Sequence, residues 1–227
     1  MKYIGYIKRI MEFLLVYIIV LTTFIKLKIT KGEFFFAQVG ANDGKTGDPF
    51  YNIVKFFNWK GIMFEPVPYV FEKLKENYSD NKNIILENSA LTKSTDKLNF
   101  YYLKKDNNPN LPNWYDQIGS FNLEVLKKHK DSIEGFDNLL THTEVPTTTF
   151  EEVIKKYKLK NIDFIFIDTE GYDYEIVKMV PFKKINPSLI LFEHKHLDEK
   201  DLKECLKMLT ELGYKNFLTR DDYLFYK

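Results

Sequence analysis

Apolar residues are arranged along this chain in two patterns. Short apolar runs, which predict buried strands, are separated by segments in which apolar residues recur every three or four positions, which predict amphipathic helices. The predicted strands are 34–39, 61–64, 83–86, 162–167 and 188–192, with two more within 216–226. Strands that alternate with helices predict an α/β fold with a doubly wound, mostly parallel, seven-stranded Rossmann-like sheet.

The first predicted strand ends in a loop bounded by glycines. A helix is expected just beyond this loop, with Asp48 as its N-cap. Glycines let a backbone approach a ligand closely, and free N–H groups at a helix start attract polar ligand groups. We therefore expect the loop to bind a cofactor through residues Gly40, Ala41, Asn42, Asp43 and Gly44.

Glu65 ends the second predicted strand, about 20 residues after the loop, where nucleotide-binding folds place a carboxylate on the ribose hydroxyls. A pyrophosphate requires a glycine in the middle of the loop, and this chain has Asn42 there. The acidic Asp43 suits a nucleoside with a positive charge. The pattern therefore favours S-adenosylmethionine, and an NAD(P)-dependent enzyme is the less favoured alternative.

Polar residues follow the other predicted strands as well. Because the carboxyl ends of parallel strands meet at one edge of a sheet, we expect these residues to share one ligand site. Residues 88–90 are expected to face the adenine. The residues that follow the third, fourth and fifth strands are Asn88, Ser89, Ala90, then Asp168, Thr169, Glu170, Gly171, then Glu193, His194, Lys195 and His196.

Methyl transfer to a hydroxyl requires that the acceptor is placed in line with the methyl group and that its proton is removed. The candidate catalytic residues are Asp168, Glu170 and His194, and histidine has the most suitable unperturbed pKa. A divalent cation held by Asp168, Glu193 and a histidine is an alternative. Spacing alone does not support that alternative, so no metal ligand is assigned.

The first 31 residues form a distinct apolar segment that predicts an N-terminal helix. Its apolar run, 13–25, has basic residues on both sides, is shorter than the about 20 residues that span a bilayer core, and lacks a cleavage signal. An uncleaved membrane anchor, a membrane-surface helix and a domain-capping helix are the alternatives. We expect membrane association through residues 10–28 on the cytoplasmic side, or else a cytoplasmic protein, with a catalytic domain over 32–227.

An irregular segment, 106–120, lies between a predicted extended run, 97–103, and a predicted short helix, 121–130. It contains Asn, Pro and Gly together with Trp114 and Tyr115, and it has no sustained period. Long irregular segments inside compact domains often belong to binding sites. The aromatic pair favours a substrate lid.

Composition restricts the function further. The 227 residues include 44% hydrophobic residues, enough for one sizeable core, and no change in composition marks a second catalytic domain. The formal net charge of +1 does not predict binding to nucleic acid. Cys205, the single cysteine, is expected to be a small core residue in a reducing compartment.

Several segments together resemble the FkbM-type S-adenosylmethionine-dependent methyltransferases. The matching motifs are VGANDG at 39–44, EPVPYVFEKL at 65–74, ENSAL at 87–91, IDTEGYDYEIV at 167–177 and FEHKHL at 192–197. The resemblance covers the chain from residue 34 onward. It implies a class I methyltransferase fold, S-adenosylmethionine as the methyl donor, and O-methylation of a hydroxyl, often on a sugar or a secondary metabolite.

The resemblance also implies roles for single residues. It places residues 40–44 around the methionine part of the cofactor, Glu65 on the ribose and residues 88–90 at the adenine. Asp168 and Glu170 are implied at the mouth of the active site, and which of them contacts the cofactor and which the acceptor stays open.

We therefore expect an O-methyltransferase that acts on a hydroxyl of a small molecule, with a sugar or glycan as the favoured acceptor. The alternative is a catalytically inactive module that binds the cofactor, or that is anchored to a membrane and mediates an interaction, on the same fold. Binding of S-adenosylmethionine and of NAD would separate these interpretations.

Overall fold

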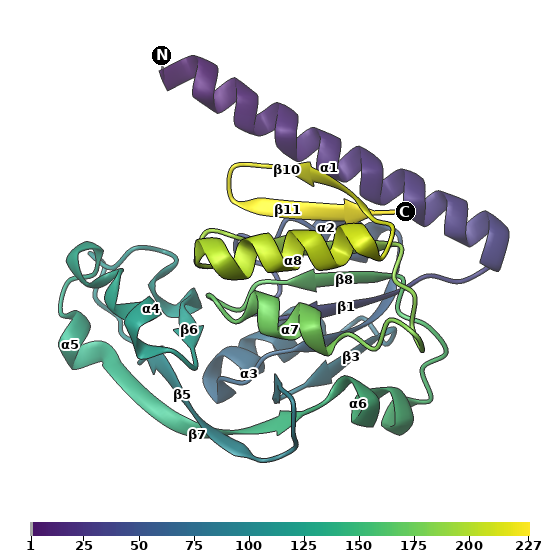
Figure 1. Cartoon of the computed structure of the whole chain (residues 1–227). Coiled ribbons are helices and arrows are strands. Elements are labelled where there is room, and N and C mark those ends of the chain that lie inside the picture. Colours follow the sequence, from purple (N-terminus) through teal and green to yellow (C-terminus); the bar gives the residue numbers. More distant parts are fainter. Residues whose placement is uncertain (1) are drawn as a thin grey trace.

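A seven-stranded sheet forms the centre of the molecule in a computed structural model that describes residues 2–227 (Figure 1). The strand order is β10-β11-β9-β8-β1-β2-β3, and β11 runs in the opposite direction to the other six strands. The prediction of a doubly wound, mostly parallel sheet is therefore confirmed. The strands are β1 (Phe35–Val39), β2 (Lys60–Phe64), β3 (Ile84–Glu87), β8 (Phe164–Ile167), β9 (Leu189–Glu193), β10 (Lys215–Leu218) and β11 (Asp222–Tyr226).

Helices cover both faces of this sheet, which is why its central strands are apolar on both sides. Ala37 and Val39 of β1 face one core together with α6 (Phe150–Tyr157), α7 (Asp173–Met179) and α8 (Glu199–Glu211). Phe36 faces the other core, under α1 (Lys2–Lys31), α2 (Tyr51–Phe56) and α3 (Pro68–Asn77). Such alternation buries every side chain of a parallel strand.

Side chains cap several of these helices as the sequence predicts. Thr149 accepts a hydrogen bond from the amide of Glu152 at the start of α6, and Asp198 accepts one from Asp201 at the start of α8. Asp48, the predicted N-cap of α2, lies two residues before the observed N-cap, Phe50, and its carboxylate accepts from the amides of Phe50 and Tyr51. Each cap satisfies N–H groups that the helix itself leaves free.

A second, four-stranded sheet lies beside the first, and the sequence analysis did not predict it as a sheet. Its order is β4-β7-β5-β6, with β7 antiparallel to β5 along most of its length. Figure 1 shows it, with the short helices α4 and α5, below and to one side of the main sheet. Its elements are β4 (Ala90–Leu91), β5 (Lys97–Leu103), β6 (Gly119–Ser120), β7 (Leu140–Thr148), α4 (Leu123–Lys127) and α5 (Phe136–Leu139), with 3-10 turns at Tyr115–Gln117 and Lys130–Ser132.

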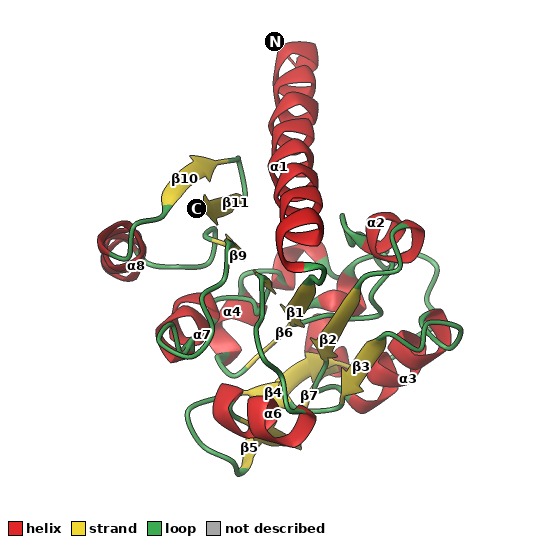
Figure 2. Ribbon diagram, turned by 90° about the vertical axis from the view of Figure 1, so that its right-hand side faces the viewer, coloured by secondary structure: helices red, strands yellow, loops and turns green. Residues whose placement is uncertain are grey.

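Helix α1 packs its second half on the main sheet. Val16, Val20, Phe24 and Leu27 are buried in the same core as Phe36, and the Tyr17 hydroxyl donates to the carbonyl of Pro49. The first half of the helix extends beyond the sheet, which Figures 1 and 2 show from two sides. The predicted N-terminal apolar helix is therefore present, and half of it caps the domain.

Candidate functional site

A pocket opens where β1, β2 and β8 end. This is the edge at which parallel α/β sheets bind ligands. Of the predicted site residues, those that line this pocket are Gly40, Asn42, Glu65, Ser89, Ala90, Asp168 and Glu170. Residues from four separate stretches of the chain therefore meet here, as the positions of the strand ends predict.

Gly40 makes the approach of two strand ends possible. Its φ is +81°, and a Cβ atom at this position would overlap the backbone oxygen of Asp168. Any other residue would therefore push the glycine loop away from the end of β8. Asn42, with φ +50°, continues the turn into the pocket.

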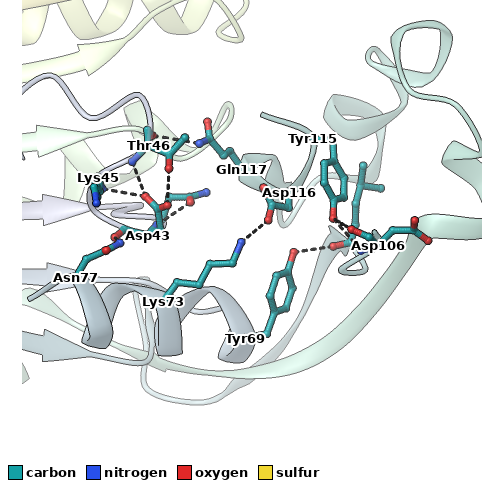
Figure 3. Close-up of polar contacts among 12 residues, drawn as sticks. Asp43, Lys45, Thr46, Tyr69, Lys73, Asn77, Asp106, Tyr115, Asp116 and Gln117 are labelled. Carbon is teal, nitrogen blue, oxygen red and sulfur yellow. Dashed lines mark hydrogen bonds and ion pairs between the residues drawn. The ribbon is translucent and has the colours of Figure 1, made fainter. Parts of the chain in front are cut away.

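The remaining loop residues support the turn from behind. The Asp43 carboxylate accepts hydrogen bonds from the amides of Lys45 and Thr46 at 2.9 and 2.7 Å, and Asn77 of α3 donates to the Asp43 carbonyl at 2.8 Å (Figure 3). Ala41 is buried in the core, and Gly44 lies against α3. These three predicted cofactor residues shape the pocket but do not line it.

Glu65 is a buried carboxylate at the end of β2, with 6% of its surface exposed. It accepts hydrogen bonds from the amide of Asn42 at 2.9 Å and from that of Val67 at 2.8 Å. Burial raises the pKa of Glu65 to about 7, although these two bonds act in the opposite direction. A carboxylate accepts about four hydrogen bonds, so two remain for a ligand in the pocket.

The residues predicted to face the adenine differ in their surroundings. Asn88 donates to the carbonyls of Glu65 and Pro66 at 2.8 and 3.1 Å, so its side chain holds the end of β2. Ser89 and Ala90 line the pocket. Within the described residues the buried Ser89 hydroxyl has no hydrogen-bond partner, which leaves it free to bind a polar ligand atom.

The loop after β8 adopts an unusual backbone conformation that directs Glu170 toward the pocket. Glu170 and Gly171 have φ values of +50° and +93°. Asp173, fully buried at the start of α7, accepts hydrogen bonds from the Thr169 hydroxyl at 3.0 Å and the Gly171 amide at 3.2 Å. Sequence reasoning assigned no role to Asp173, although an acid in the first turn of the helix is a signal for such a bond.

His196, and not His194, lies beside Glu170. The His196 Nε2 atom is 3.2 Å from Glu170 Oε2 and 3.5 Å from Glu193 Oε2, and 7% of its side chain is exposed. The His194 ring instead packs on Tyr223 and lines a groove under α1. The chain turns after β9, with Leu197 donating to the His194 carbonyl, so these two histidines face different surroundings.

Crowding of carboxylates controls the charge of this site. Burial, and then neighbouring acids, raise the pKa of Asp168 to about 6, of Glu170 to about 8 and of Glu193 to about 9. The Asp168 side chain is itself exposed to the pocket. Its pKa is raised because the protein atoms around it limit the hydration of the carboxylate. Burial also lowers the pKa of His196 to about 4, which leaves a neutral imidazole at neutral pH.

A second cavity adjoins the first. Its walls include Trp114, His129, Ser132 and Lys195, and it shares Gln117, Ile118 and Glu170 with the first pocket. Most of its lining is polar, and Trp114 adds a flat aromatic surface that is 38% exposed. The two cavities therefore meet at Gln117, Ile118 and Glu170.

The C-terminal part of the predicted lid segment, 106–120, lines both cavities, through residues 116–119 in the first and Trp114, Gln117 and Ile118 in the second. Figure 3 shows how it is fixed: Lys73 of α3 contacts Asp116 at 2.6 Å, and Gln117 donates to the Thr46 carbonyl at 3.1 Å. The Tyr115 hydroxyl bonds both the amide and the carbonyl of Asp106. The segment is thus tied to the glycine loop and to α3.

Two overlapping groups could supply ligands to a metal ion. Asp168, Glu170 and Glu193 form one group, and His129, Glu170 and His196 form the other, with donor atoms in each group within 4.8 Å of one another. Among the described residues, neither group combines Asp168, Glu193 and a histidine, which is the set that the metal alternative requires. Acidic pockets also occur without an ion, and a chelator experiment distinguishes the two cases.

Comparison with known proteins identifies the family. The family model described as the methyltransferase FkbM domain matches residues 38–216, which include every pocket residue named above. The chain belongs to the FkbM methyltransferase family. A search of curated proteins found no match.

Solved structures agree with this FkbM fold. Methyltransferase FkbM from Methylobacillus flagellatus KT is 14% identical with a TM-score of 0.54, over 86% of this chain and 43% of that one. The chain thus spans less than half of that FkbM protein. Aeropyrum pernix fibrillarin with bound S-adenosyl-L-methionine (11% identity, TM-score 0.40, 86% and 66% coverage) and human METTL16 with SAH (11%, 0.41, 86% and 61%) are more distant matches.

Proposed function

We propose that this FkbM protein is an S-adenosylmethionine-dependent O-methyltransferase that methylates a hydroxyl of a small molecule, with a sugar or glycan as the acceptor class. The observation that carries the proposal is the position of Glu170 between two cavities. One cavity has the features of a nucleoside site, and the other is polar and open to an acceptor.

The residues of the first cavity fit the cofactor. Glu65 has two free acceptor positions for ribose hydroxyls, Ser89 has an unpartnered hydroxyl near the expected adenine, and Gly40 keeps the backbone close. Bound S-adenosylmethionine would supply a methyl group on a sulfonium, which leaves as a neutral thioether. Asn42 in place of a glycine disfavours the pyrophosphate of NAD.

Glu170 would accept the proton of the attacking hydroxyl. Glu170 lines both cavities, and the neutral imidazole of His196 lies 3.2 Å from its Oε2 atom. In its ionised form, which predominates above a pH of about 8, the Glu170 carboxylate is basic enough to take a proton from an alcohol during methyl transfer. Gln117 and Ile118 at the same junction restrict the direction of approach.

The second cavity suits a carbohydrate. Trp114 offers an aromatic face to the apolar side of a sugar ring, and polar groups from Ser132, His129 and Glu193 can bind hydroxyls. The His129 Nε2 and Glu193 Oε2 atoms are buried and unpartnered among the described residues, which leaves them available for acceptor hydroxyls.

The proposal is tested by incubating the protein with isotope-labelled S-adenosylmethionine and a panel of sugars, sugar nucleotides and glycans. O-methylated product, identified by mass spectrometry, is the expected result. Calorimetry with S-adenosylmethionine and with NAD accompanies the assay. Cofactor binding without any methylated product would favour the inactive module, and NAD binding would favour the dehydrogenase alternative.

Cofactor affinity is expected to depend on the charge of Glu65. Below a pKa of about 7 the group is protonated and loses an acceptor position, so affinity for S-adenosylmethionine should fall as pH decreases. Between pH 8 and pH 6 the ionised fraction falls about tenfold, and Kd should rise by about the same factor. Calorimetry at several pH values measures this change.

Glu65→Gln serves as the control for that titration. Its affinity should be about tenfold to a hundredfold lower at pH 8 and nearly independent of pH, because a hydrogen bond to a charged group contributes about 1.5 to 3 kcal/mol. Thermal melting checks that the variant is folded, since Glu65 also bonds two backbone amides. An equal pH dependence of Kd in the wild type and in Glu65→Gln would show that Glu65 does not cause the pH dependence.

A further inference from the structure

Helix α1 has two apolar faces, and only one of them packs on the domain. The buried face carries Val16, Val20, Phe24 and Leu27. A second stripe contains large apolar residues that are 49% to 79% exposed along the helix. Its members, Ile7, Met11, Leu14, Ile18, Ile25 and Ile29, fall within about 60° of one another at 100° per residue, on the side opposite the buried face.

Basic residues lie along both sides of this exposed stripe. Lys8 and Lys26 flank it on one side and Lys28 on the other, and all three are exposed. Residues 5–31 contain five basic residues against the single acid Glu12. Long basic side chains beside an apolar stripe can reach lipid phosphates while the stripe enters the acyl region.

We propose that α1 lies in the plane of an anionic membrane surface, with the exposed stripe inserted and the methyltransferase domain on the aqueous side. Charge decides between the possible partners: a second copy would bring two strongly basic helices together, whereas anionic lipid attracts them. The inference is independent of the reaction that the pocket catalyses.

The same contacts argue against a membrane-spanning helix. A window of this helix is long and apolar enough to span by length and composition. Spanning would, however, withdraw Val20 and Phe24 from the core and uncover Phe34 and Trp59, on which Phe24 packs. At the other end Arg9 contacts Asp221 at 3.6 Å, which holds the first half of the helix beside the domain.

Flotation of the full-length protein with vesicles tests this inference. We expect binding to vesicles of phosphatidylcholine and phosphatidylglycerol in equal amounts, and much weaker binding to phosphatidylcholine alone. Lys8→Gln/Lys26→Gln should reduce binding to the anionic vesicles by roughly thirtyfold. Leu14→Glu/Ile18→Glu should reduce it on the order of a hundredfold.

A matched control carries the same charge change elsewhere. Leu98 on β5 and Leu212 at the end of α8 are also exposed, at 40% and 39%, and lie outside α1. Leu98→Glu/Leu212→Glu should bind vesicles like the wild type. Equal loss in both double variants would overturn the assignment of the stripe.

Depth measurements separate a helix in the plane from one that spans. Cysteines placed at positions 7, 18 and 29 carry a nitroxide label, and Cys205 is buried and should not react. A helix in the membrane plane places all three labels at one depth, whereas a spanning helix places position 18 deepest. A depth gradient, no binding by the wild type, or a dimer that Leu14→Glu/Ile18→Glu dissociates would overturn the proposal.

Discussion

Glu170→Gln is expected to lower kcat by about 10² to 10⁴, because the glutamine side chain keeps the shape of the residue but cannot accept the acceptor proton. Affinity for S-adenosylhomocysteine should stay unchanged, since Glu65 and Ser89 are intact. Single-turnover methyl transfer and calorimetry measure the two quantities. The proposal therefore predicts a loss in the chemical step alone.

Three controls define this result. Glu211→Gln, on the exposed face of α8, should have no effect on kcat. His194→Ala should also leave kcat unchanged, because His194 lines the groove under α1 instead of the pocket. A chelator should have no effect if Glu170 acts as a base. Full turnover of Glu170→Gln, or complete inhibition by the chelator, would contradict the assignment of Glu170 as the base.

Gly40→Ala is expected to lower the free energy of unfolding by about 3 to 5 kcal/mol and to abolish cofactor binding. The substituted residue would have to adopt an unfavourable φ of +81°, and its added Cβ atom would overlap the Asp168 backbone. Relief requires that the end of β1 moves away from β8, which opens the pocket floor. Urea unfolding and calorimetry measure both effects.

The control substitution Gly213→Ala separates the cost of the positive φ from the cost of the overlap with Asp168. Gly213 has a similar φ of +86°, but a Cβ atom there would meet nothing within 4 Å. The control should therefore cost only the backbone conformation, about 1 to 2 kcal/mol, and should leave cofactor binding intact. Equal destabilisation by both substitutions would show that the contact with Asp168 has no role.

The strand ends were predictable because their sequence signal is local. Apolar runs that end in Gly40, Glu65 and Asp168 identify buried parallel strands, and topology then brings their carboxyl ends to one edge. The family motifs reach the same residues. Asp43, Gly44 and Asn88 were predicted to bind the cofactor, and the structure places these three residues behind the pocket wall.

The choice between the two histidines depended on tertiary structure. His194 and His196 both follow the fifth predicted strand, and side-chain direction after a strand depends on the turn that follows. Here the His194 amide donates to Asp221, which keeps this residue beside β11, and the next turn brings His196 back to Glu170. No spacing rule in the sequence contains that information.

The second sheet and the exposed stripe on α1 were missed for a different reason. The sequence of β7 contains several threonines and few large apolar residues, because one face of the strand is open to solvent. The apolar run 13–25 looked uniform in sequence, although in the structure it divides into a buried face and an exposed face. Only the packing of the helix on the domain distinguishes these two faces.

A crystal structure of the protein soaked with S-adenosylhomocysteine would locate the cofactor site. We expect ribose hydroxyls within hydrogen-bond distance of Glu65, the adenine beside Ser89, and the thioether sulfur facing the junction bounded by Gln117, Ile118 and Glu170. A ligand bound elsewhere, or a sulfur atom that points away from Glu170, would contradict this expectation.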